Sequence, residues 1–385
     1  MSRTRLFASL CGLVFLLNLA RIVFAPLLDV FVAEFAIGEA TAGLIVTLVW
    51  VGSASPRLPA GWLLTRVSRH HVVLGSGTIL VVASGLAANA TTVRHLLVGA
   101  FLMGIASGVY FVAANPLLSE LFPDRVGRVM GVHGAAAQIG AVAAAPFVAL
   151  TLIVDWRLSL WAIAAGAVLV TAATWVAARE TEMPTAGDAD REFVAGALSE
   201  WPLIVTALAI VGAASFVWQG LFNFYELYMQ SKGLSDRASG TLLTIVFAAG
   251  VPAFFFSGDL ADRFPHVPYL LGIVGTFAAT LLLLTTVEGF LALAVLSGVV
   301  GVVIHALFPA TDAYLLDTLP DSTRGSAYAV FSSAWMLTQA LGSSALGLVL
   351  ERGYTYDGVF AGAALLLGVT AVALLGLERT GRLPS

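Results

Sequence analysis

The sequence predicts an all-α membrane protein with twelve transmembrane helices, arranged as two pseudo-symmetric six-helix bundles. Three observations support this fold class: an apolar composition, twelve apolar segments of bilayer length, and an internal repeat at one fixed spacing. Of the 385 residues, 59% are hydrophobic and 11% are charged, whereas soluble domains carry roughly 25% charged residues. So few charges cannot cover the surface of a soluble protein of this length, so lipid is the expected solvent for most of it.

The apolar segments have the length that a membrane helix needs. A bilayer core of about 30 Å requires about 20 apolar helical residues. Twelve segments meet this length, at 6–28, 41–64, 72–90, 95–118, 130–153, 157–178, 202–229, 239–257, 267–287, 289–314, 326–350 and 357–378. The first is too long for the core of a signal peptide. Membrane strands are excluded because the segments lack alternation and are about twice as long as a barrel strand.

The basic residues predict the orientation of these helices. With the N-terminus inside, twelve basic residues fall in cytoplasmic segments and five in external loops. This bias places both termini in the cytoplasm and favours a multi-pass protein of the plasma membrane. The longest polar stretch follows the sixth helix and divides the chain nearly in half. We therefore expect an N-terminal bundle at 1–178, a cytoplasmic linker at 179–200 and a C-terminal bundle at 201–385.

Several function classes are excluded by composition and motifs. The net charge of −4 offers no basic surface for nucleic acid, and Cys11 has no second cysteine to pair with. The chain contains neither a phosphate-binding G-x-x-x-x-G-K-[ST] nor H-E-x-x-H. Asp259 and Asp262 would need a second acid-rich stretch to hold a metal pair, and the first half has Trp62 and Thr65 there. We expect no enzyme activity, no cofactor, no metal and a monomer.

An internal repeat appears when the chain is laid on itself with a shift of 197 residues. The pattern F-x-x-x-[ND]-x-x-L-x-x-x-x-P-D begins at Phe111 and again at Phe308. The same shift aligns three further pairs: Gly61 with Gly258, Arg66 with Arg263, and Gly104 with Gly301. A single match is weak in an apolar sequence, but a shared spacing over such a length indicates duplication.

A parallel repeat of six helices around a central linker resembles the major facilitator superfamily. The segment GDLADRF at 258–264 is similar to the loop motif G-x-L-A-D-R of that family. The first half has GWLLTRVSRHH at 61–71, with Thr65 in place of the aspartate, and Trp156-Arg157 resembles the pair that opens helix six. The resemblance implies secondary transport by alternating access. It also implies a conformational gate at Gly61, Arg66, Gly258, Asp262 and Arg263, whose charges can exchange partners as the halves rock.

Two arginines at membrane depth are the first candidates for solute binding. Ionisable residues inside spanning helices are costly and are functional candidates by default. Arg21 shares a helix face with Asn18, and Arg57 lies one turn before Gly61. A guanidinium fork binds carboxylate, phosphate or nitrate in two-point contact. The alternative is that these long side chains reach the membrane interface instead. The position that matches Arg57 in the second half is Phe254, so an arginine pair related by symmetry is absent.

Asp312 and His305 lie seven residues apart, on one face of the tenth helix, and could carry a coupling proton. Asp312 could equally be a fixed counter-ion to Arg21 or Arg57. Its repeat mate is Asn115, which is uncharged.

Uncharged polar side chains complete the predicted solute site. Asn115, Gln219, Asn223 and Gln339 are expected to orient the solute, although hydrogen bonding between helices would also explain Gln339. The sequence therefore predicts a secondary active transporter, with symport expected, for a small anionic or polar solute. Its partners would be the solute, the lipid bilayer and protons. Two alternatives stay open: efflux of drugs or metabolites by the same fold, and a receptor that does not transport.

Overall fold

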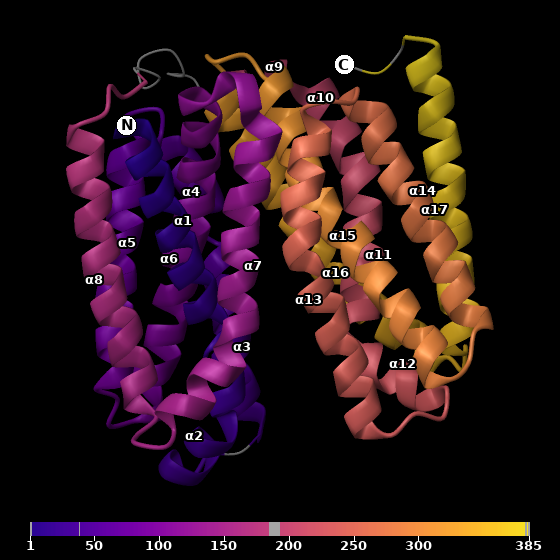
Figure 1. Cartoon of the computed structure of the whole chain (residues 1–385), viewed down its shortest axis with the longest axis horizontal. Helices are drawn as coiled ribbons and strands as arrows, with labels where there is room; N and C mark the ends of the chain where they lie inside the picture. Colours follow the sequence, from indigo (N-terminus) through magenta and orange to yellow (C-terminus); the bar gives the residue numbers. More distant parts are fainter. Residues whose placement is uncertain (1, 38, 185–192, 382, 384–385) are drawn as a thin grey trace. The chain divides into compact units, whose positions relative to one another are not determined.

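The structure, a computed structural model, describes residues 2–37, 39–184, 193–381 and 383, and these fall into helices and short connections (Figure 1). Eight residues of the predicted 179–200 linker, 185–192, lie outside the described residues. The chain forms two compact units. Unit 1 comprises 1–123, 136–199 and 320–330, and unit 2 comprises 124–135, 200–319 and 331–385.

Unit 1 is built from the helices of the first half of the chain. They are α1 (Ser2–Ile22), η1 (Ala25–Leu27), α2 (Leu28–Phe35), α3 (Glu39–Ala54), α4 (Arg57–Leu63), α5 (Arg69–Ala88), α6 (Val93–Leu121), the larger part of α7 (Val126–Thr151), α8 (Arg157–Arg179) and α9 (Phe193–Ser199). Its most extensive helix contacts join α5 to α6, α3 to α6, α5 to α8 and α1 to α8. Figure 1 shows α1, α5, α6 and α8 running side by side.

Unit 2 repeats this plan with the second half of the chain. Its helices are α10 (Trp201–Ala207), the π-helical turn η3 (Leu208–Gly212), α11 (Ala213–Asn223), α12 (Tyr225–Ser231), α13 (Asp236–Ala261), α14 (His266–Thr286), α15 (Phe290–Thr318), the larger part of α16 (Arg324–Glu351) and α17 (Tyr356–Arg379). Contacts of α13 with α15, and of α14 with α15 and α17, dominate its packing. The first turns of α7 belong to unit 2 and those of α16 to unit 1.

Eleven stretches of the described chain are helical, long and apolar enough to cross a membrane. The twelfth predicted span, 41–64, differs from the prediction because it is divided into α3 and α4 at Ser55-Pro56. Pro56 has no N–H and so cannot continue the helical hydrogen-bond ladder. The chain resumes at once, since Ala60 N donates to Pro56 O at 2.7 Å. Such breaks are tolerated in membrane helices when neighbouring groups satisfy the backbone.

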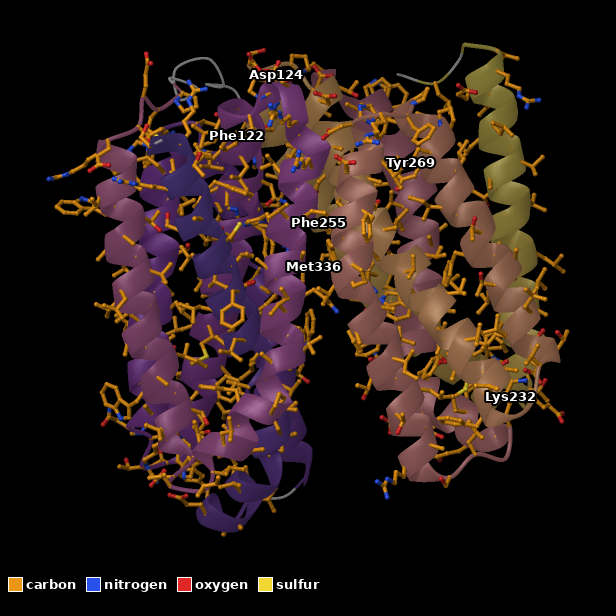
Figure 2. The ribbon with its side chains drawn as sticks, in the orientation of Figure 1. Phe122, Asp124, Lys232, Phe255, Tyr269 and Met336 are labelled. Atoms are coloured by element: carbon orange, nitrogen blue, oxygen red, sulfur yellow. The ribbon has the colours of Figure 1, made fainter. Side chains whose placement is uncertain are left out.

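Polar contacts tie the helix ends of each unit together. In unit 1, Glu34 accepts from Trp156 Nε1 at 2.5 Å and from Arg157 Nη2 at 2.7 Å, so the Trp-Arg pair anchors α8 to α2. In unit 2, the single lysine, Lys232, is 6% exposed and lies 3.1 Å from Asp357. Figure 2 labels Lys232 at one end of unit 2 and Tyr269, at the start of α14, at the other.

Candidate functional site

The predicted gate residues of the second half join α13 to the start of α7, inside unit 2. Asp262 Oδ1 accepts from Gly127 N at 2.6 Å, and Oδ2 accepts from Arg128 N at 2.8 Å. A carboxylate at a helix N-terminus satisfies backbone N–H groups and interacts well with the helix dipole. Burial raises the pKa of Asp262 above its usual value, although the two backbone donors act in the opposite direction. Arg263 pairs with Asp259 at 2.6 Å instead of contacting α7.

Glycine makes this contact possible. A Cβ atom on Gly258 would lie 2.2 Å from Gly127 O and 2.8 Å from Gly131 Cα. The backbones of α13 and α7 are therefore in direct contact, and a larger residue at Gly258 would separate them. Gly127 and Gly131 were not among the predicted gate residues. The glycine spacing at the start of α7 was the available signal for them.

The predicted gate residues of the first half have different contacts. Gly61 faces the start of α16 and α9, since its Cβ would lie 2.4 Å from Ala329 Cβ and 2.8 Å from Phe193 Cε2. Arg66 is exposed and lies over the ring of Trp62 at 3.9 Å. Thr65 donates to Trp62 O within its own segment. The carboxylate contact of unit 2 is thus not repeated at this position of unit 1.

A different polar contact is present in both units and was not predicted from the sequence. In unit 1, Arg69 Nη2 and Nε donate to Glu120 Oε1 at 2.7 and 3.0 Å, and both side chains are buried. In unit 2, His266 Nε2 lies 3.2 Å from Asp317 Oδ2. The 197-residue shift relates Arg69 to His266 and Glu120 to Asp317. Applying that shift to every charged residue would have revealed these two pairs.

Two predicted solute residues of unit 1, Asn18 and Arg57, lie close to Arg21. Arg21 Nη1 donates to Asn18 Oδ1 at 3.1 Å, and the guanidinium lies 4.3 Å from the ring centre of Trp50. Arg57 lies close enough for the two positive charges to repel each other, and its Nε donates to Ser53 O at 3.2 Å. Arg21 Nε is buried and has no hydrogen-bond partner among the described residues. Trp50 was not predicted as part of the site.

Asn115 makes a specific contact away from this cluster. Its side-chain nitrogen donates to Tyr328 Oη at 2.7 Å, and Tyr328 lies in the part of α16 that belongs to unit 1. This contact satisfies the side-chain nitrogen of Asn115. A role of Asn115 in solute binding stays a prediction.

The predicted residues of unit 2 lie on three helices. Gln219 and Asn223 are on α11, His305 and Asp312 are on α15, and Gln339 is on α16. His305 Nδ1 lies 2.7 Å from Gly301 O, a carbonyl, so this nitrogen carries the proton in the neutral ring. Aromatic rings surround His305: Trp218, Phe247, Phe254 and Phe308 all have ring centres within 6.2 Å. This aromatic surrounding was not predicted from the sequence.

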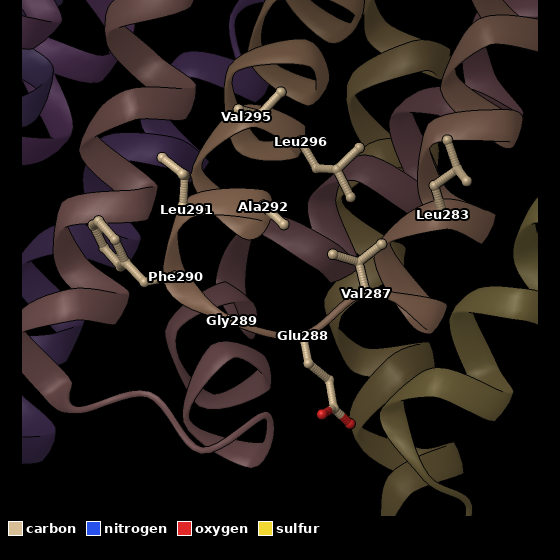
Figure 3. A pocket seen from close by; sticks show the side chains of 9 residues that line it. All are labelled: Leu283, Val287, Glu288, Gly289, Phe290, Leu291, Ala292, Val295 and Leu296. Atoms are coloured by element: carbon tan, nitrogen blue, oxygen red, sulfur yellow. The ribbon is translucent and has the colours of Figure 1, made fainter.

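An apolar groove between α14 and α15 has a different character (Figure 3). It is lined by Leu283, Val287, Glu288, Gly289, Phe290, Leu291, Ala292, Val295 and Leu296. Figure 3 shows the Glu288 carboxylate pointing away from the apolar side chains. The lining contains no cation and none of the predicted solute residues, so the groove does not fit the predicted anion site.

The fold and the site together define a multi-pass, two-unit helical membrane protein with charged and polar groups inside its helices. Comparison with known proteins then identifies the family. Residues 10–287 and 211–384 match the Major Facilitator Superfamily. The chain belongs to this superfamily, whose members transport small-molecule solutes.

Individual relatives agree with this assignment. The chain is 22% identical over 380 residues to the Bacillus subtilis (strain 168) protein named uncharacterized MFS-type transporter YwfA, covering 96% of this chain and 91% of that protein. It is 24% identical over 268 residues to the multidrug resistance protein MdtL of Shewanella oneidensis, covering 67% and 66%. A stretch of 138 residues is 29% identical to the galactose-proton symporter of Escherichia coli (strain K12), covering 36% of this chain and 29% of that protein.

A solved structure has the same fold. The Major Facilitator Superfamily transporter FucP, in its outward conformation, matches with a TM-score of 0.72 at 18% identity, covering 97% of this chain and 98% of that one. At this identity the likeness concerns the fold alone.

Proposed function

We propose that this chain is a secondary active transporter that moves a small anionic or polar solute across the plasma membrane by alternating access, coupled to protons. Residues 1–178 and 201–385 would act as the two moving bundles, 179–200 as the linker, and the chain would work as a monomer with both termini in the cytoplasm. Membership of a transporter family supports the general mechanism. The charge and the chemical class of the solute are inferred from the residues of this chain.

The observation that carries the anionic solute is the environment of Arg21. Its charge lies in an apolar helix, close to a second guanidinium, and it stacks on Trp50. The ion pairs of the described side chains do not include Arg21. An unneutralised charge at such a position is costly. An anion bound to the two guanidiniums would offset that cost with charge-assisted hydrogen bonds.

The test is uptake into proteoliposomes over a panel of small anions, with and without a pH gradient. Arg21→Ala should reduce uptake by at least about 30-fold, because loss of one partner of a buried charge contact costs about 2 kcal/mol or more. Arg94→Ala is the matched control, since Arg94 is exposed in the same unit. Uptake by Arg21→Ala at the wild-type rate would refute the binding role.

The proton carrier is tested in the same assay. Asp312→Asn should abolish accumulation driven by a pH gradient and leave solute exchange without a gradient intact. If His305 carries the proton instead, His305→Gln will have this effect and Asp312→Asn will not.

The contact of Asp262 with the start of α7 supports a role as a conformational gate. A short, solvent-accessible contact of backbone and carboxylate can form and break as a transporter changes state. Gly258 and Arg263 flank this contact, and Gly61 and Arg66 occupy the corresponding positions of unit 1. The alternative of drug efflux has support from the MdtL relative. Solute accumulation in inside-out proteoliposomes but not in right-side-out ones would favour efflux.

A further inference from the structure

A cluster of polar contacts joins three helices at one end of unit 1, and we call it the first clamp. Glu34, on α2, accepts from Arg157 Nη2 at 2.7 Å and from the indole nitrogen of Trp156. Arg157, at the start of α8, also donates to Ala90 O, just beyond the end of α5, at 3.2 Å. Its guanidinium lies 4.3 Å from the ring centre of Trp156, and Asp155 is a second, more distant acid at 3.9 Å. The first clamp thus combines an acid, a base, an aromatic donor and a backbone carbonyl.

Unit 2 has a cluster of the same four kinds of group, which we call the second clamp. Lys232, directly after α12, lies 3.1 Å from Asp357 Oδ1 and donates to Thr285 O, in the last turn of α14, at 3.3 Å. Asp357, in the first turn of α17, accepts from Tyr228 Oη at 2.5 Å. Lys232 Nζ lies 5.2 Å from the ring centre of Tyr228. In both clamps, therefore, the base covers the aromatic side chain that donates to the acid.

The helices that the two clamps join have corresponding places in the repeat. α5 and α14 begin at Arg69 and His266, 197 residues apart, and α8 and α17 end at Arg179 and Arg379, 200 residues apart. α2 and α12 are short segments that follow α1 and α11. The charges, however, are exchanged. The first clamp has its acid on α2 and its base on α8, whereas the second has its base at the end of α12 and its acid on α17. The two units therefore share the attraction between these helices and differ in its polarity.

Each clamp holds a short segment that a helix break separates from a long helix. α1 ends at Ile22, and Pro26, in η1, lacks the N–H that would continue the helical hydrogen bonds. α11 ends at Asn223, and Phe224 departs from helical geometry, with φ −108° and ψ 9°. Because the direction of the chain can change at such breaks, the side-chain contacts of the clamps are needed to fix α2 and α12.

The breaks lie beside predicted solute residues. Arg21 is the last residue but one of α1, and Asn223 is the last residue of α11. A few residues at the end of a helix can absorb the backbone change of a hinge. The position of α2 and α12 therefore sets one side of a possible hinge, and a predicted solute residue lies on the other side.

We propose that the two clamps keep α2 and α12 docked on α8 and α17 by charge attraction, and that either polarity serves. Glu34, Arg157, Lys232 and Asp357 are then positioning residues, which fix the far side of the breaks next to Arg21 and Asn223. α2 and α12 lie at the ends of their units opposite the start of α1 and the end of α17 (Figure 1). The proposed orientation places these ends outside the cell. The inference concerns each unit by itself and does not depend on the solute.

Cysteine labelling of the purified full-length chain measures the docking. Met229, on α12, and Leu27, just before α2, are fully buried. A cysteine at either position, with Cys11 replaced by serine, should react with maleimide only when the segment moves away. A cysteine at Leu227, which is 51% exposed on α12, gives the rate for an accessible position.

Removing the acid of each clamp should increase these labelling rates. Asp357→Ala leaves the ammonium group of Lys232, which is 6% exposed, without its acid. The rate at position 229 should rise by at least about 30-fold, as expected when one partner of a buried charge pair is removed. Glu34→Ala should raise the rate at position 27 by about twofold to fivefold, because both charges of the first clamp are about one-third exposed.

Exchanging the two charges tests the polarity. Lys232→Glu places two acids next to each other and should increase the labelling rate at position 229. Lys232→Glu combined with Asp357→Lys gives the second clamp the polarity of the first. This double variant should label about tenfold more slowly than Lys232→Glu, the coupling expected between residues in contact. Arg352→Glu is the matched control, because it makes the same charge change at an exposed position before α17.

Several results would overturn the proposal. An unchanged labelling rate in Asp357→Ala or in Glu34→Ala would overturn the clamp of that unit. A double variant that labels as fast as Lys232→Glu would show that charge attraction does not hold α12. Equal rates at positions 229 and 227 in the parent chain would show that α12 is not docked. If Lys232→Glu fails to fold, recovery of the folded chain in the double variant would support the clamp, and failure of both would contradict it.

Discussion

Unit 1 and unit 2 share the same helix contacts but place different side chains at them. Gly104 and Gly301 let α6 and α15 approach a neighbouring carbonyl in the same way, and Arg69–Glu120 corresponds to His266–Asp317. At Arg57, by contrast, unit 2 has Phe254. Contacts that hold helices together are therefore kept in both units, whereas a residue predicted to bind the solute in unit 1 is replaced by phenylalanine in unit 2.

The largest expected effect concerns the repeated ion pairs. Arg69 and Glu120 are 5% and 7% exposed, whereas Asp317 is 50% exposed. Glu120→Gln should destabilise the chain by about 3–5 kcal/mol, because it leaves a buried charge without its partner. Asp317→Asn should cost less than about 1 kcal/mol, as is usual for an exposed pair. Unfolding in detergent measures both, and equal costs would show that the two pairs are equivalent.

Replacing a residue of unit 1 with its counterpart in unit 2 would test this difference between the units directly. Arg57→Phe places the unit 2 residue in unit 1 and removes a guanidinium. Anion affinity should fall by about 30-fold, corresponding to about 2 kcal/mol for one lost charge contact. Arg94→Phe introduces the same side chain at an exposed position and should leave affinity unchanged. Wild-type anion binding by Arg57→Phe would assign the positive charge of the site to Arg21 alone.

Removing the contact between Asp262 and the start of α7 should have a smaller effect. Asp262→Ala removes the acceptor for Gly127 N and Arg128 N and should weaken the packing of α7 on α13 by about 1 kcal/mol. Val129 is 7% exposed, so a cysteine there, with Cys11 replaced by serine, should react faster with maleimide in Asp262→Ala. Asp259→Ala is the control because Asp259 pairs with Arg263 on its own helix. Identical labelling rates in the two variants would exclude a gate role for Asp262.

The smallest expected effect concerns Trp50. Trp50→Leu removes the ring that Arg21 stacks on, and a partly exposed cation–π contact contributes about 0.5–1 kcal/mol. Anion affinity should change by roughly twofold to fivefold. Trp161→Leu, on the exposed surface of α8, should have no effect. A change as large as that of Arg21→Ala would mean that Trp50 contacts the solute itself.

Much of the fold followed from local properties of the sequence. Apolar segments of bilayer length predicted the helices, and the Asp262 motif predicted a polar contact at a helix end. The break at Pro56 was not predicted, because a proline can either kink a membrane helix or interrupt it, depending on its neighbours. Arg69–Glu120 was also missed, since its members are 51 residues apart and look like ordinary loop charges.

The sequence by itself determined the class of this protein, because composition and segment length decide which solvent a chain can face. The repeat spacing likewise indicated two related halves before any contact was known. Only the tertiary structure decided that Arg21 meets Trp50 and that four aromatic rings surround His305. These groups come from different helices, and their separation depends on how closely glycine lets the helices approach, which no local pattern encodes.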